Sequence, residues 1–448
     1  MKLKDKHCIV VGLGKSGLAT CRFLKERGAR VQAFDISKTI EENTLKDLGV
    51  EVHLGQNPTG EEEADLVVMS PGIPLDLPFV QAFLKHKVEV TGEVELAYRF
   101  AKGSFLGITG TNGKTTTTTL LGDLLSFVSY DTRVVGNIGA PVIEEVQTSG
   151  DDTFFVTELS SFQLETVKEF KCRVAGILNV TPDHLNRHGS LENYGNIKAN
   201  IFMNQEEDDV AVLNFEDGFV RSLGEKCRAK VLWFSVRQRV SPGLYLKDGQ
   251  IISTLKGEDE VLFARSEVAL AGDHNMENVL MAMCMAYSVG VSFDAMRMVL
   301  NVFQGVEHRL EFVRELGGIR YINDSKGTNP DASTKAVEAF EGNLILIAGG
   351  MDKKVSFDTF VEAFQGKVKT LILLGETKKM IQECAERHGF RDVILVEDMK
   401  EAVERAHSIA VEGDLVLLSP ACASWDMYPS YEVRGEDFKS RVRELKEK

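Results

Sequence analysis

The stretch GITGTNGKTTTTTL, at residues 107–120, joins an apolar strand to a Gly/Thr-rich loop and a helix. We predict the strand over 104–109. The loop after it contains Gly110, Thr111, Asn112 and Gly113, and the helix opens with Lys114, Thr115 and Thr116. In such a loop, backbone N–H groups surround phosphate oxygens, while Lys114 supplies positive charge and the Thr115 hydroxyl can ligate Mg²⁺. The usual spacing has glycine where this chain has Ile108, so the stretch is a variant P-loop. The alternative is a Gly/Thr turn with an incidental lysine.

On both sides of this loop, short β-branched runs alternate with longer amphipathic stretches, which indicates helices packed on mostly parallel sheets. A chain of 448 residues favours three domains. We therefore predict an α/β fold with a Rossmann-like domain over 1–94, an ATP-binding P-loop domain over 95–303 and a second Rossmann-like domain over 304–448. Within 231–263, the segment GLYLKDGQIIST predicts a hairpin at the edge of the middle sheet.

Composition narrows the class of protein. Lys and Arg number 52 against 67 Asp and Glu, giving a formal charge of -15, which argues against a general nucleic-acid binder. The seven cysteines form no CxxC pair, as expected for thiols in a reducing compartment. Apolar runs stay well short of the roughly 18 residues that a membrane helix needs. We expect a cytoplasmic protein without a membrane partner, and a monomer by default.

A second glycine loop, Gly12-Leu13-Gly14-Lys15-Ser16-Gly17, follows the first strand, and Asp35 ends the next strand. This pattern matches the dinucleotide fingerprint, in which the backbone approaches a pyrophosphate and the acid contacts a ribose hydroxyl. An oxidoreductase using NAD, or a purely structural glycine turn, would explain the same residues.

Polar residues downstream of the P-loop form a third feature: Asn137, Glu158, His184 and Lys198. The first three each follow an apolar run, so the carboxyl edge of the sheet could bring them beside the ATP phosphates. Glu158 is a natural ligand for Mg²⁺. Taken singly, each would be an ordinary polar residue, and only the association with the P-loop makes them candidates.

The last domain carries four polar segments: His308-Arg309, NDSKGTNP at 323–330, GGMDK at 349–353 and SPACASWD at 419–426. Three of them directly follow an apolar strand, where the binding crevice of an open α/β sheet lies. Lysine, arginine and hydroxyl groups suit a small carboxylate substrate, although loops are rich in Gly, Ser, Asn and Asp for backbone reasons alone.

Together these motifs resemble the Mur ligase family from end to end. GTNGKTT is shared across that family, whereas NDSKGTNP and SPACASWD are similar to the members that add D-glutamate. The resemblance implies an ATP-dependent ligase that joins D-glutamate to UDP-N-acetylmuramoyl-L-alanine through an acyl phosphate, in peptidoglycan precursor synthesis. The first glycine loop, with SPGIP at 70–74, would then hold the UDP-sugar.

The resemblance also implies roles for single residues. Lys114, Thr115 and Glu158 would hold ATP with one Mg²⁺. His184 would hold a second Mg²⁺ together with Lys198, which CO₂ would carbamylate into a carboxylate-like ligand. Lys114, His184 and Lys198 would be the catalytic residues. The implied nucleotide-binding residues are Gly110, Thr111, Asn112, Gly113, Lys114, Thr115, Thr116, Asn278, Arg309 and Asp324. The implied substrate-binding residues are Gly14, Ser16, Asp35, Ser70, Gly72, Asn137, Thr328, Lys353, Ser424 and Tyr431.

Two departures from the family pattern concern substrate contacts: Ile36 stands where a small polar residue is expected, and Tyr431 where an aromatic residue without a hydroxyl is familiar. Three alternatives stay open. Another ligase of this architecture could add a different amino acid or extend folate, although a folate ligase should lack the first domain. An NAD-dependent oxidoreductase would leave Lys114, Glu158 and Lys198 unexplained. A non-catalytic nucleotide switch would not need two crevices for small acidic ligands.

Overall fold

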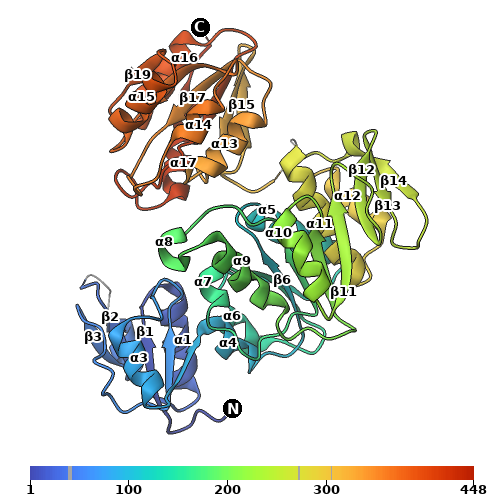
Figure 1. Cartoon of the computed structure of the whole chain (residues 1–448). Helices are drawn as coiled ribbons and strands as arrows, with labels where there is room; N and C mark the ends of the chain where they lie inside the picture. Colours follow the sequence, from blue (N-terminus) through green and yellow to red (C-terminus); the bar gives the residue numbers. More distant parts are fainter. Residues whose placement is uncertain (39–42, 271–272, 304, 448) are drawn as a thin grey trace. The chain divides into compact units, whose positions relative to one another are not determined.

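The computed structural model describes residues 1–38, 43–270, 273–303 and 305–447. Within these residues the strands form three sheets, each covered by helices (Figure 1). Nearly all neighbouring strands run parallel; the exceptions are β12–β13–β14 and β15–β16. The predicted three-domain α/β fold is therefore confirmed.

The first sheet has the strand order β3-β2-β1-β4-β5, and all of its strands are parallel. Its strands are β1 (His7–Val11), β2 (Arg30–Asp35), β3 (Glu51–Leu54), β4 (Leu66–Met69) and β5 (Glu89–Gly92), and its helices are α1 (Lys15–Glu26), α2 (Asn43–Asp47) and α3 (Pro78–Lys85). The chain reverses its winding between β1 and β4, which is where open α/β sheets bind ligands. We did not predict β3 and β5, because neither four-residue strand has a continuous apolar run.

The middle sheet has the order β14-β13-β12-β11-β10-β9-β6-β8-β7. Its strands are β6 (Ser104–Thr109), β7 (Thr132–Gly136), β8 (Phe154–Glu158), β9 (Val174–Ile177), β10 (Val210–Asn214), β11 (Lys230–Ser235), β12 (Gly243–Lys247), β13 (Gln250–Ser253) and β14 (Glu260–Ala264). The predicted hairpin is present: β12 and β13 are antiparallel, and Asp248 and Gly249 turn between them with φ of 49° and 71°.

The helices of this part are α4 (Glu93–Tyr98), α5 (Lys114–Phe127), α6 (Val142–Glu145), α7 (Ser161–Leu164), α8 (Leu185–His188), α9 (Leu191–Ala199), α10 (Gly218–Leu223), α11 (Asp273–Ser288) and α12 (Phe293–Leu300). The strand-loop-helix unit predicted around the P-loop corresponds to β6 and α5.

The third sheet has the order β15-β16-β20-β17-β18-β19. Its strands are β15 (Glu311–Leu316), β16 (Ile319–Asn323), β17 (Leu344–Ala348), β18 (Val368–Leu373), β19 (Val393–Leu395) and β20 (Leu415–Leu418), and its helices are α13 (Pro330–Glu338), α14 (Asp358–Glu362), α15 (Lys378–Arg387), α16 (Met399–Ile409) and α17 (Tyr431–Glu444). Apolar residues of α13, α14 and α15 share one core cluster and those of α16 and α17 another, so the helices cover opposite faces of the sheet.

By its internal contacts the chain divides into two compact units, residues 1–268 with 277–302 and residues 269–276 with 303–448. The first and middle sheets belong to the first unit and are connected by α4, whose buried Glu95 binds it to residues 168–170 of the middle domain. Glu95 accepts hydrogen bonds from the backbone N–H groups of Lys168, Glu169 and Phe170, at 2.8 to 3.2 Å, and pairs with Arg99. The predicted domain boundaries at 94 and 303 stay predictions, and residue 304 lies outside the described residues.

Among the described residues, no helix has both the length and the apolar character that a membrane crossing requires.

Candidate active site

The loop between β6 and α5 depends on a glycine in the left-handed region. Gly113 has a φ of 85°, which side chains rarely tolerate. A Cβ atom there would also lie 2.1 Å from Oδ1 of Asn278, a residue of α11. The loop therefore takes its tight path only with glycine at 113, and Asn278 lies directly against it.

The end of β9 supports this loop. The backbone N–H of Thr111 donates to the carbonyl of Asn179 at 2.9 Å, and the N–H of Asn112 donates to Oδ1 of Asn179 at 2.9 Å. We did not single out Asn179, and only its position just after an apolar strand would have suggested it. The Lys114 ammonium donates to the carbonyl oxygens of Gly110 and Thr111 at 3.0 and 2.9 Å, so the cation lies on the loop itself.

Glu158 and Asn137 meet because Glu158 ends β8 and Asn137 directly follows the neighbouring strand β7. Nδ2 of Asn137 donates to Oε1 of Glu158 at 2.7 Å. Glu158 is only 1% exposed, and its Oε2 has no hydrogen-bond partner among the described residues. Burying a carboxylate oxygen without a donor is costly. This orphaned oxygen fits a cation ligand.

Lys198, in α9, lies at the same edge of the sheet. It is 1% exposed, its Nζ donates to the Gly110 carbonyl at 2.9 Å, and the Tyr194 ring lies 4.4 Å from Nζ. Burial, followed by the nearby charge of Lys114, lowers the pKa of Lys198 well below its usual value, against the opposing influence of Asp183 and Glu158. An amine in this setting favours its neutral form. Asp183 is a neighbour that we did not predict.

His184 lies at the rim of this group. It precedes α8 with a φ of 52°, its side chain is 48% exposed, and its Nε2 is 3.6 Å from Oδ2 of Asp183. The buried histidine nearby is His188, which is hydrogen-bonded to Ser161 at 3.0 Å. Burial lowers the pKa of His188, which favours the neutral imidazole. The structure thus brings Lys114, Glu158 and Lys198 together more closely than His184.

At the switch point of the first sheet, the loops after β1 and β4 touch. A Cβ atom on Gly12, whose φ is 89°, would lie 2.5 Å from Cβ of Ser70. The Asp35 carboxylate accepts from the N–H of Leu13 at 2.6 Å and from that of Ser37 at 2.7 Å, so it shapes both adjoining loops. Gly14 and Gly72 face open space, and Ser16 is half-buried. These are the backbone positions that a ligand could approach.

Two contacts join these loops to the middle domain. Nζ of Lys15 donates to the carbonyl of Gly139, two residues after Asn137, at 3.2 Å. Arg187, in α8, donates to the carbonyl of Ile73 at 3.0 Å and pairs with Glu165 at 2.5 Å. Within the first compact unit, the loops after β1 and β4 therefore contact the middle domain, which carries the P-loop.

In the second compact unit, polar residues gather at the carboxyl ends of β16 and β20, which are neighbours. Oδ2 of the buried Asp324 accepts from the Ser419 hydroxyl at 2.7 Å, and Oδ1 accepts from the N–H of Leu310 at 3.2 Å. Burial raises the pKa of Asp324 to about 6, opposed by these hydrogen bonds and by the charges of Arg309 and Arg434.

Arg434, in α17, ties two predicted loops together. Its guanidinium donates to the carbonyls of Ser325 and Cys422 at 2.8 and 3.1 Å, and burial lowers its pKa to about 10. We did not predict it, because an arginine within a polar helix normally indicates a solvated face.

The remaining predicted residues of this unit lie on or beside these loops. Nζ of Lys326 is 5.3 Å from the centre of the Tyr431 ring, and Nζ of the exposed Lys353 is 6.0 Å from the Trp425 ring. Arg309 and Thr328 are half-buried, and Ser424 is buried.

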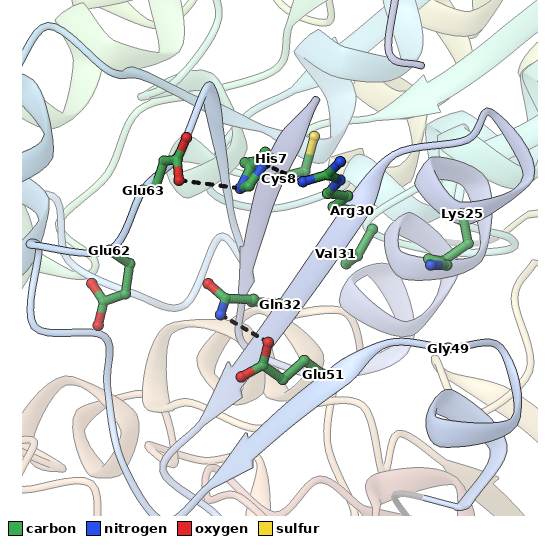
Figure 2. Close-up of a pocket in the computed structure, with 10 residues that line it drawn as sticks. All are labelled: His7, Cys8, Lys25, Arg30, Val31, Gln32, Gly49, Glu51, Glu62 and Glu63. Atoms are coloured by element: carbon green, nitrogen blue, oxygen red, sulfur yellow. Dashed lines mark hydrogen bonds and ion pairs between the residues drawn. The ribbon is translucent and has the colours of Figure 1, made fainter. Parts of the chain in front are cut away.

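A pocket of about 470 Å³ lies elsewhere in the first domain, lined by residues that include His7, Arg30, Gln32 and Glu51 (Figure 2). Gln32 donates to Glu51 at 3.0 Å, and Arg30 lies 3.2 Å from the His7 ring. These residues begin the strands β1, β2 and β3 or lie near their beginnings, whereas the glycine loop follows the end of β1. The pocket is therefore separate from the candidate site.

Three family descriptions match the chain: "Mur ligase MurD-like, N-terminal domain" at residues 6–92, "Mur ligase middle domain" at 108–286, and "Mur ligase, glutamate ligase domain" at 308–422. The UDP-N-acetylmuramoylalanine–D-glutamate ligase of Clostridioides difficile (strain 630) is 48% identical, over 100% of both chains. The enzyme of the same name from Thermoanaerobacter sp. (strain X514) is 46% identical, also over 100% of both chains.

Two solved structures share the fold. The UDP-N-acetylmuramate-alanine ligase MurC of Thermotoga maritima has a TM-score of 0.61 at 20% identity, covering 98% of this chain and 100% of that one. The MurF ligase of Thermotoga maritima, in complex with ADP, has a TM-score of 0.60 at 18% identity, covering 98% and 96%. At these identities the likeness shows the fold alone.

Proposed function

Because this chain belongs to the Mur ligase family, we propose that it joins D-glutamate to UDP-N-acetylmuramoyl-L-alanine with the energy of ATP, in peptidoglycan precursor synthesis. The match to D-glutamate ligases extends over the whole chain. The observation that carries the proposal is the convergence of the P-loop, the orphaned oxygen of Glu158 and the buried amine of Lys198 at one sheet edge.

A carboxylate is a poor acyl donor, so the reaction needs an activated intermediate. ATP transfers its γ-phosphoryl group to the alanyl carboxylate, which gives an acyl phosphate and ADP. The amine of D-glutamate attacks the acyl carbon, the C–O bond to phosphate breaks, and the amine loses a proton. Catalysis of this kind consists mainly of positioning and charge neutralisation. We assign Lys114 to the ATP phosphates, where its positive charge would neutralise negative charge during transfer of the γ-phosphoryl group.

The residues present fit two Mg²⁺ ions. The Thr115 hydroxyl and Glu158 would hold one, and the unpaired Oε2 of Glu158 supports this assignment. His184 and Lys198 would hold the other, with His184 contributing from the rim. Bound Mg²⁺ would neutralise phosphate charge during transfer.

Carbamylation of Lys198 is part of the proposal. A neutral amine can add CO₂ with loss of one proton, which converts a lysine into an anion. The burial of Lys198 and its lowered pKa favour the neutral amine that this addition needs. An uncharged or cationic lysine would otherwise be a poor neighbour for a metal ion.

Substrate roles follow the predicted sets. Gly14, Ser16, Asp35, Ser70 and Gly72 would bind the UDP-sugar, with Asn137 nearer the reacting carboxylate. Thr328, Lys353, Ser424 and Tyr431 would bind D-glutamate. Gly110, Thr111, Asn112, Gly113, Thr116, Asn278, Arg309 and Asp324 would contact the nucleotide. Asp35 already satisfies two backbone N–H groups, so we propose that it acts partly by holding the loops in place.

A cytoplasmic monomer completes the proposal. The seven cysteines, all among the described residues, are free thiols, and most are buried, which is usual in a reducing compartment.

The test is phosphate release from ATP with Mg²⁺, bicarbonate and UDP-N-acetylmuramoyl-L-alanine, measured with D-glutamate and with a panel of other amino acids. Release that requires both D-glutamate and the UDP precursor is the expected result. Release with a different amino acid would assign the chain another substrate within the family. Folded protein that releases no phosphate under any of these conditions would overturn the proposal.

A further inference from the structure

A group of metal-ligating side chains lies between α14 and α15, in the second compact unit. Among the described residues, the ligand atoms of Asp358, Cys384 and His388 all lie within 4.8 Å of one another. Oδ1 of Asp358 is 2.9 Å from Nε2 of His388 and 3.5 Å from Sγ of Cys384. None of these residues belongs to the proposed ligase site.

The two helices hold this group in place. Cys384 and His388 are four residues apart at the end of α15, so their side chains lie on one face of the helix. Asp358 is the first residue of α14, and apolar residues of both helices share one core cluster. Cys384 is 2% exposed, whereas the His388 side chain is 28% exposed and leaves an approach from solvent.

The group is also distant from the loops assigned to D-glutamate. Thr377, which precedes α15, bonds to Gly350 at the carboxyl end of β17. His388 lies eleven residues further on, about 16 Å along a helix. The cluster is therefore near the opposite end of α15 from the predicted substrate loops.

The arrangement does not suit a nucleophilic cysteine. In such a site the imidazole lies between the thiol and the carboxylate, so that it can take the thiol proton. Here the carboxylate is the shared partner, and it contacts both the imidazole and the thiol. Cys384 is also buried.

A second group, Glu307, His308 and Glu436, has a similar composition. It already encloses a cation, because the buried ammonium of Lys439 lies 2.6 Å from Glu436 and also contacts Glu307. At the Asp358 group the guanidinium of Arg387 lies 3.6 Å from Oδ1, and its side chain is 62% exposed and can turn into solvent.

We propose that Asp358, Cys384 and His388 form a binding site for a borderline divalent metal ion such as Zn²⁺ or Co²⁺, which braces α14 against α15. One thiolate, one imidazole and one carboxylate form a ligand set for Zn²⁺ rather than Mg²⁺, and a water molecule would complete a tetrahedron. On binding, the Cys384 Sγ–H bond breaks, its proton passes to solvent, and the sulfur electron pair forms the bond to the metal.

The test uses the full chain, treated with a chelator and kept reduced with a phosphine. It is titrated with Co²⁺ while the near-ultraviolet thiolate-to-cobalt absorption is followed. This absorption reports a sulfur ligand, so oxygen and nitrogen sites near Glu158 do not contribute. We expect it to saturate at one equivalent, to disappear when Zn²⁺ is added, and to persist in excess Mg²⁺.

Matched variants identify the ligands. Cys384→Ser should abolish the absorption. His388→Gln should weaken Co²⁺ binding at least tenfold, because loss of even a residue that only hydrogen-bonds to a metal ligand lowers metal affinity about 10- to 100-fold. Cys227→Ser, at a half-buried thiol in the other unit, should leave it unchanged. Because His388 is exposed, its variant should fold normally. Zn²⁺ should raise the unfolding temperature of the parent chain but not that of His388→Gln.

Three results would each overturn the proposal: no thiolate-to-cobalt absorption in the parent chain, an absorption that survives in Cys384→Ser, or Co²⁺ binding by His388→Gln as tight as that of the parent chain. Phosphate release by these variants should match the parent chain, so failure of the metal site leaves the proposed ligase function untouched.

Discussion

At the scale of single residues, we expect the buried amine of Lys198 to lower the stability of the fold while serving the reaction. Its hydrogen bond goes to the Gly110 carbonyl, which also accepts from Lys114. Replacing Lys198 with methionine therefore removes a buried polar group without leaving that carbonyl unsatisfied. We expect Lys198→Met to unfold at a higher temperature than the parent chain near neutral pH, without nucleotide, Mg²⁺ or bicarbonate, and to lose phosphate release.

The pH dependence of this effect has a definite sign. Between the lowered pKa of folded Lys198 and the usual value near 10.5, the unfolded chain binds more protons, so parent stability rises with pH across this window. The advantage of Lys198→Met should thus shrink as the pH approaches that value. Lys230→Met, at an exposed lysine, is the control. A Lys198→Met protein less stable than the parent at neutral pH would contradict this account.

The orphaned oxygen of Glu158 makes a separate prediction. Glu158→Gln keeps an oxygen for the Asn137 amide but removes the negative charge and one oxygen acceptor. We expect phosphate release to fall by about 100-fold or more, equivalent to roughly 3 kcal/mol, and the Mg²⁺ concentration for half-maximal rate to rise. Glu192→Gln, in the exposed first turn of α9, should behave like the parent chain. A Glu158→Gln enzyme with normal Mg²⁺ dependence would exclude Glu158 as a metal ligand.

For Asp324 we expect stability to change with pH in the opposite direction to that expected for Lys198. Its folded pKa of about 6 exceeds the usual 3.8, so the folded state binds more protons between these values and stability falls as pH rises through this window. A pKa difference of about 2 corresponds to at most roughly 3 kcal/mol. Asp324→Asn should therefore gain stability relative to the parent between pH 4 and about 7. The measurement is the melting temperature of each protein at both pH values, with Asp392→Asn, at an exposed position, as the control. Absence of this gain in Asp324→Asn would contradict the raised pKa of Asp324.

At the scale of elements, the turn from β6 into α5 depends on one backbone conformation. Gly113→Ala must adopt a left-handed φ, at about 1 to 2 kcal/mol, and must also displace Asn278. We expect a lower unfolding temperature and at least tenfold weaker ATP binding by calorimetry. Gly218→Ala is the matched control, since it also begins a helix but has open space around it. Equal effects from both substitutions would contradict the special role of Gly113.

The limits of prediction from sequence are also clearest at this scale. Strands with continuous apolar runs, such as β6 and β17, were predictable because both of their faces are buried. β15 (EFVREL) was not, because it is a partly exposed edge strand paired through the Gly317-Gly318 turn. Residues after predictable strands, Glu158 among them, could be assigned to a sheet edge.

Residues whose role depends on a neighbour could not be assigned in this way. Asn179 acts through its contact with the P-loop, Asp183 through its proximity to Lys198, and Arg434 through two loops distant in sequence. Sequence spacing carries no information about such contacts. The left-handed backbone of His184 and the exposure of its side chain are likewise not revealed by its position in NVTPDHLNRHG.

At the scale of the whole molecule, Glu95 holds α4, the helix that connects the first sheet to the middle sheet, against residues 168–170. Its carboxylate accepts three backbone N–H groups and pairs with Arg99, and the Glu95 side chain is fully buried. Glu95→Gln would direct an amide N–H₂ group towards these donors. We expect a loss of about 3 kcal/mol in unfolding free energy and faster proteolysis near residues 92–104. Glu61→Gln, at an exposed position of the first domain, is the control, and equal proteolysis of both variants would refute this role.

The tip of the hairpin of β12 and β13 is a suitable attachment site for engineering. Its Asp248-Gly249 tip adopts the left-handed conformations of a two-residue turn, and a side chain at Gly249 would meet open space. Three strands separate β12 from β6, a distance of about 19 Å at the usual spacing. Exposed loop tips of this kind tolerate insertions. A fluorophore, an affinity peptide or a surface tether attached there should leave the nucleotide loop unaltered, so that the working enzyme can be immobilised in a single orientation.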